Sequence, residues 1–186
     1  MSEADSESNY LINMFATIYR LLPHPSIDYS VVFKTGIKNS KTYKILSYIL
    51  EELLKKQKQQ YVPTGEIFWE KLVIGSLNDE EIFKRCIRVI SKINLEISLF
   101  CRIIAFALEY EDSFYVQREG LDILENFVKD KDKLELKLAE INKQKIPSLL
   151  NNFSKRGNNK LKERAAWLLD YILGPMTDMS SRIESL

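Results

Sequence analysis

Apolar residues recur every three or four positions along most of this chain, and short polar or proline-containing breaks separate the periodic segments. In the first segment the apolar positions are Leu11, Met14, Phe15, Ile18 and Leu22. This spacing places them on one face of an α-helix. The same period predicts helices over residues 40–60, 65–75, 78–93, 95–110, 113–129, 134–143, 147–154 and 160–173. The pattern therefore predicts an all-α fold.

The breaks between these segments carry the residues that stop helices. Pro23 and Pro25 end the first helix, because proline lacks a backbone donor and restricts the residue before it. Tyr29 to Phe33 fits a short strand or an extended connector. Because no second strand-like segment exists for it to pair with, residues 26–37 are predicted to be a loop that can include a helical turn. Gly174 and Pro175 are predicted to stop the last helix. We also expect both tryptophans, Trp69 and Trp167, and Ile67 to lie in the core.

The length of 186 residues and the composition are those of an ordinary globular chain, with six glycines and five prolines. So few turn-forming residues argue against a sandwich or a barrel. We expect residues 1–8 to be a disordered acidic segment, residues 9–174 a single α-helical domain, and residues 175–186 a flexible tail.

Neither a signal peptide nor a membrane span is apparent. The N-terminus is acidic, and no apolar run approaches the roughly 20 residues that cross a bilayer. We therefore expect a cytoplasmic or nuclear protein that is not secreted and does not enter a membrane. Lys and Arg number 27 against 26 Asp and Glu, so the global charge indicates no class of partner.

Four helical segments share a small residue followed by apolar residues four and seven positions later. The small residues are Thr42, Cys86, Gly120 and Ala165, spaced 44, 34 and 45 positions apart. Small side chains let two helices approach closely. Glycine inside a helix costs about 1 kcal/mol relative to alanine, so Gly120 indicates a packing requirement.

The stretch from Ile146 to Leu173 carries a resemblance to a known family. Its first part, IPSLLNNFSK, resembles the middle helix of an armadillo/HEAT-like repeat, and KERAAWLLDYI resembles the last helix. The resemblance implies an irregular armadillo/HEAT-like stack of about eight helices. It also implies a concave face that binds an extended peptide or a partner helix. A non-repeat helical bundle is the alternative fold.

Residues that carry chemistry are sparse. The single histidine, His24, lies between two prolines and lacks the partners of a zinc site. Glu109, Glu111 and Asp112 cluster at one turn. Such a cluster is usually the ordinary charge of helix ends and a solvated turn; the alternative is a metal site or an acid–base pair. The sequence contains neither GxxxxGK[ST] nor GxGxxG, the glycine-rich motifs that bind phosphate groups. We therefore expect no enzyme, with no catalytic residue, metal ligand or cofactor.

The two cysteines, Cys86 and Cys101, lie in strongly apolar segments. We expect them to be buried reduced thiols, because a disulfide framework needs more cysteines and a secretory context.

A basic segment is the first candidate binding site. From Lys145 to Arg164 six basic residues stand against one glutamate, for a net charge of +5. Positive segments of this kind can contact phosphates. The residues proposed to contact a partner are Lys155, Arg156, Lys160, Lys162 and Arg164.

Aromatic residues beside an acidic turn are the second candidate binding site. Tyr110, Phe114 and Tyr115 flank Glu111 and Asp112. Aromatic side chains often anchor protein interfaces. The sequence thus predicts a protein–protein interaction module, an adaptor or scaffold subunit whose partner is another protein or a second copy. The alternative is a nucleic-acid-associated helical protein that uses the basic segment.

Overall fold

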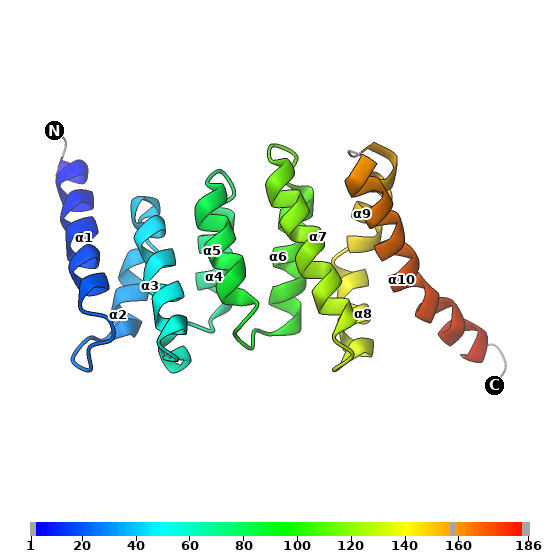
Figure 1. The fold of residues 1–186 in the computed structure, drawn as a ribbon, viewed down its shortest axis with the longest axis horizontal. Helices are drawn as coiled ribbons and strands as arrows, with labels where there is room; N and C mark the ends of the chain where they lie inside the picture. Colours follow the sequence, from blue (N-terminus) through cyan, green and yellow to red (C-terminus); the bar gives the residue numbers. More distant parts are fainter. Residues whose placement is uncertain (1–2, 157–158, 184–186) are drawn as a thin grey trace. The chain divides into compact units, whose positions relative to one another are not determined.

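A computed structural model describes residues 3–156 and 159–183 (Figure 1). These residues form α-helices and two short 3₁₀ helices, and none of them lies in a strand. The prediction of an all-α fold is confirmed. No helix in these ranges is long and apolar enough to cross a membrane.

The chain forms two compact units, residues 1–95 (unit 1) and 96–186 (unit 2). The helices of unit 1 are α1 (Glu3–Arg20), α2 (Tyr29–Gly36), η1 (Ser40–Thr42), α3 (Tyr43–Lys55), η2 (Gln59–Tyr61), α4 (Glu66–Ile74) and α5 (Glu80–Ile90). Those of unit 2 are α6 (Ile97–Glu109), α7 (Phe114–Lys129), α8 (Leu134–Lys143), α9 (Ile146–Arg156) and α10 (Asn159–Ile183).

Unit 1 is organised around α3, which packs against α1 on one side and α5 on the other (Figure 1). One face of α3 is fully buried, through Leu46, Ile49, Leu50 and Leu53. These positions follow the helical period, so the amphipathic pattern of the sequence is also the packing pattern. Trp69 of α4 is fully buried, as expected, and its Nε1 donates to the carbonyl oxygen of Pro63 at 2.7 Å.

The prediction of a loop over residues 26–37 is wrong, because α2 occupies most of this segment. The Asp28 carboxylate caps α2 by accepting hydrogen bonds from the backbone N–H groups of Ser30 and Val31. Tyr29, Val32 and Phe33 are buried at the spacing of one helical face. An N-cap followed by this spacing is a helix signal.

Unit 2 is organised around α6, which contacts α7, α8 and α9. The helix buries Leu99, Cys101, Ile103, Ile104, Ala105, Ala107 and Leu108. A helix that is apolar on nearly every side needs neighbours on several sides. Burial of Cys101, like that of Cys86 in α5, agrees with the expectation from the sequence.

The close approach expected at Gly120 is present between α6 and α7. A Cβ atom at Gly120 would lie 3.0 Å from the Cβ of Ala107. The other small residues of the pattern, Thr42, Cys86 and Ala165, are also buried. Gly120 therefore lets α6 and α7 lie closer together than a larger side chain at this position would allow.

Both ends of the periodic region differ from the sequence prediction. Helix α1 begins at Glu3, within the segment expected to be disordered. Helix α10 continues to Ile183, within the expected flexible tail and beyond the predicted stop at Gly174 and Pro175. Proline already has a helical φ angle and costs the helix one backbone donor, so it does not always end a helix.

Two side chains expected in the core are exposed instead. Trp167 is 43% exposed and Ile67 is 71% exposed. On α10 the buried positions are Leu161, Ala165, Leu168 and Ile172, which follow the helical period and leave Trp167 beside this stripe. A large apolar residue next to a buried stripe cannot be placed by its hydrophobicity alone.

Candidate functional site

The predicted basic segment does not form one uniform cationic surface. The side chains of Lys155 and Lys160 are exposed, and those of Lys162 and Arg164 are half-buried. The side chain of Arg156 lies outside the described residues. The segment spans the end of α9 and the first turns of α10.

Arg164 is held by two carboxylates of α7. Its Nε lies 2.8 Å and its Nη2 2.5 Å from Oε2 of Glu125, and its Nη1 pairs with Asp122. Hydrogen bonds from Lys129 and then Arg164 hold the pKa of Glu125 below its usual value. The guanidinium is therefore engaged within the chain and joins α10 to α7.

Beside this ion pair α10 carries an aromatic pair that faces solvent in part. The rings of Trp167 and Tyr171 stack with centroids 5.3 Å apart and planes at 30°. The Nζ of Lys129 lies 5.4 Å from the Trp167 ring centroid and 2.5 Å from Oε1 of Glu125. We call the surface formed by Asp122, Glu125, Lys129, Arg164, Trp167 and Tyr171 the α7–α10 face.

The predicted aromatic turn exposes one ring. Phe114, at the start of α7, is 48% exposed, whereas Tyr110 and Tyr115 are half-buried. The Arg118 guanidinium lies 5.0 Å from the centroid of the Tyr115 ring. The turn therefore offers less accessible aromatic surface than the three residues suggested.

The acidic residues at this turn do not converge. The side chains of Glu109, Glu111 and Asp112 are all exposed. Among the residues that the structure describes, no group of three or more His, Cys, Asp or Glu side chains is arranged to hold a metal ion. Nothing in their placement supports the alternative of a carboxylate site.

The two cysteines are buried, and the histidine makes hydrogen bonds within a turn. Burial raises the pKa of Cys86 and of Cys101 to about 12. His24 lies in an exposed turn, where its imidazole Nδ1 accepts from the backbone N–H of Ser26 at 3.2 Å. The backbone N–H of His24 donates to the Tyr29 hydroxyl at 3.0 Å. These contacts stabilise the turn between α1 and α2.

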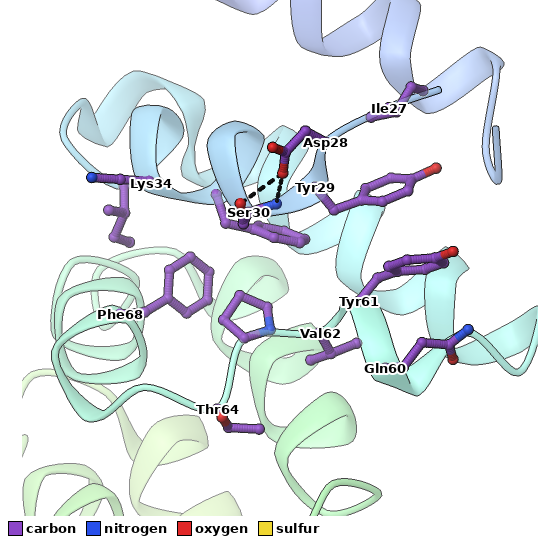
Figure 2. A pocket seen from close by; sticks show the side chains of 13 residues that line it. Ile27, Asp28, Tyr29, Ser30, Lys34, Gln60, Tyr61, Val62, Thr64 and Phe68 are labelled. Carbon is purple, nitrogen blue, oxygen red and sulfur yellow. Dashed lines mark hydrogen bonds between the residues drawn. The ribbon is translucent and has the colours of Figure 1, made fainter. Parts of the chain in front are cut away.

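A hollow in unit 1 was not predicted from the sequence. It has a volume of about 570 Å³ and lies between α2, η2 and the start of α4 (Figure 2). Volumes of this order are typical of ligand pockets. Two aromatic contacts form much of its wall, Tyr29 with Tyr61 at 4.9 Å and Phe33 with Phe68 at 5.5 Å between centroids.

Charged groups lie at the rim of this hollow. Asp28 accepts hydrogen bonds from the backbone of α2 and from the Ser30 hydroxyl at 2.6 Å, so its charge serves the helix start. Lys34 extends from α2 at another edge of the hollow (Figure 2). Its ammonium group has no acidic partner among the described residues. The N-cap at Asp28 is a signal for the helix over residues 29–36, but no local pattern in the sequence indicates the hollow itself.

Comparisons of the chain with known protein families, with curated proteins and with solved structures gave no match. The geometry of the two units is therefore the basis for assigning a function.

Proposed function

We propose that this protein is a non-catalytic protein-interaction module, an adaptor or scaffold subunit of an intracellular complex. Its docking surface is the α7–α10 face. The observation that carries the proposal is the partly exposed Trp167 ring stacked on Tyr171. A second copy of the chain is one possible protein partner.

The aromatic pair has the properties of an interface anchor. Tryptophan, tyrosine and arginine dominate the binding energy of many interfaces. Trp167 is already fixed by Tyr171 on one side and by Lys129 nearby, so its ordering on binding costs little conformational entropy. Charged groups surround the rings and match the polar rim of an interface.

We further propose that the helices form armadillo/HEAT-like hairpins. In support, each unit contains a Glu–Arg bridge between two helices. Glu51 of α3 accepts from Nε of Arg85 of α5 at 3.2 Å, and Glu125 accepts from Arg164 at 2.8 Å. The partners are 34 and 39 positions apart in sequence. The second spacing is close to the length of a HEAT or armadillo repeat, about 40 to 47 residues, and the first is shorter.

The nucleic-acid alternative has weaker support. It requires the basic residues of α9 and α10 to act together on phosphates. Arg164 is instead neutralised by Asp122 and Glu125. Binding to a nucleic acid that falls steeply with salt and depends on Lys155, Lys160 and Lys162 would favour this alternative over protein docking.

Site-specific photo-crosslinking tests the proposal. A photo-reactive amino acid in place of Tyr171 is expected to join the full chain to a distinct protein in cells that produce it. The same amino acid in place of Leu136, an exposed apolar residue of α8, is the control. Equal products from both positions, or products made only of nucleic acid, would contradict the proposal.

A further inference from the structure

We propose that the hollow in unit 1 is a second binding site, which takes a short acidic peptide with an apolar side chain as its anchor. This site is separate from the α7–α10 face and does not depend on the function proposed for it. The argument rests on the shape of the hollow, its apolar walls and the unpaired positive charge at its edge.

The walls suit an apolar side chain. Tyr29, Phe33, Val62 and Phe68 are buried residues that also line the hollow, so their inner surfaces are held in place. Pre-formed concave sites of this kind are the usual places where an apolar group binds. An anchoring side chain would bury its surface here without first reorganising the wall.

The surroundings suit a longer occupant than one side chain. Val31 on α2 is 55% exposed, and Ile67 on α4 lies next to the pocket residue Phe68. Ile74 lies on the same face of α4 as Ile67, two turns further on, and is also exposed. A bound segment that continues past the hollow along α2 and α4 would cover these side chains.

The unpaired charge at the hollow favours an acidic occupant. The charged residues of its lining are Asp28 and Lys34. The Asp28 carboxylate is held by the N–H groups at the start of α2 and by the Ser30 hydroxyl, whereas the Lys34 ammonium group has no acidic partner among the described residues. An unpaired lysine that borders apolar surface attracts a group of opposite charge.

A peptide fits these features better than a membrane surface does. The apolar residues border a concave hollow, whereas a membrane-binding helix inserts a projecting apolar face. Within the hollow Gln60 and Thr64 supply polar groups at the edge opposite α2, where they can bond a peptide backbone (Figure 2). The occupant is therefore an extended segment rather than a lipid layer.

Selection from a random twelve-residue peptide library on the full chain tests the proposal. Enriched peptides are expected to combine net negative charge with at least one aromatic or large aliphatic residue. Their dissociation constants are then measured by fluorescence anisotropy. Lys34→Glu should weaken binding by about tenfold or more through repulsion, and Thr64→Trp should abolish it by filling the hollow.

The matched control is Lys92→Glu, which makes the same charge change at an exposed residue of unit 1 away from the hollow. It should leave binding within about twofold of wild type, as for a distant surface charge. Circular dichroism checks that each variant is folded. No enrichment, enrichment of neutral or basic peptides, or equal loss with Lys92→Glu would overturn the proposal. Binding to phosphatidylserine vesicles without any peptide enrichment would also overturn it.

Discussion

Arg164 of α10 is bound to Glu125 of α7 by two hydrogen bonds, with Nε at 2.8 Å and Nη2 at 2.5 Å from the same carboxylate oxygen. Asp122 engages the remaining nitrogen, Nη1. A guanidinium holds such a geometry because its donors form a rigid planar fork. The bond fixes the side of α10 that carries Trp167 and Tyr171.

Replacement of this arginine should cost stability. Arg164→Ala leaves Asp122 without its cation and Glu125 with Lys129 alone, and we expect the free energy of unfolding to fall by ~1 kcal/mol. Arg164→Lys should recover only part of the loss, because an ammonium group cannot reproduce the forked contact. Urea unfolding followed by circular dichroism measures both. Full recovery by lysine would show that charge alone matters.

The same contact predicts a pH dependence. The pKa of Glu125 is lowered in the folded chain by Lys129 and Arg164. Its contribution to stability is therefore present above the ordinary pKa of glutamate and is lost as the pH falls through the lowered value. Glu125→Gln should reduce the loss of stability between pH 5 and pH 3. An unchanged pH profile in this variant would show that the ion pair adds nothing in solution.

Gly120 should not tolerate a side chain. Alanine gains about 1 kcal/mol of helix propensity, but its Cβ would lie 3.0 Å from the Cβ of Ala107. Neither atom can rotate away, so we expect Gly120→Ala to lower the free energy of unfolding by about 1 to 2 kcal/mol.

Gly174 in α10 is the control, because a Cβ there meets no atom within 4 Å apart from its chain neighbours. The gain in helix propensity on Gly174→Ala is opposed by contact between the new Cβ and the ring of Pro175, so we expect the free energy of unfolding to change by less than about 0.5 kcal/mol. Stabilisation by Gly120→Ala would mean that α6 and α7 are not in close contact at Gly120.

Thiol reactivity should report on each unit separately, since Cys86 lies in unit 1 and Cys101 in unit 2. Burial raises the pKa of each thiol to about 12. At pH 8 the thiols stay protonated and shielded, and we expect labelling by a thiol reagent to be slowed by about 100-fold or more relative to the unfolded chain.

Single-cysteine variants, Cys86→Ala and Cys101→Ala, assign the rate to one site each. Rapid native-state labelling at either site would contradict the burial of that cysteine.

Helical periodicity predicted most of the fold because the apolar residues of a buried helix face recur every three or four positions in the sequence. Leu46, Ile49, Leu50 and Leu53 show this plainly. Helix α2 is only eight residues long, so its apolar positions cover one helical face only briefly, and its clearest signal is the cap at Asp28. Periodicity cannot show the division into two units, because that depends on contacts between residues far apart in the chain.

The candidate sites were less predictable from the sequence than the fold. Lysine and arginine look alike as charges in the sequence, but Arg164 is neutralised by residues about 40 positions away, which no local pattern reveals. Trp167 was expected in the core because it is large and apolar. Hydrophobicity alone does not show that it lies beside the buried face of α10 and not on it. The hollow of unit 1 needs three separate segments and has no local signature.

Quantitative affinity capture with the full chain and with Trp167→Ala tests the central claim, that the α7–α10 face is a protein-docking surface. Leu136→Ala, which removes an exposed apolar side chain from α8 of the same unit, is the control. At least one protein should be recovered with wild type and with Leu136→Ala and be reduced by about tenfold or more with Trp167→Ala, as for an interface anchor. Recovery of the same proteins in equal amounts with all three folded chains would contradict the claim.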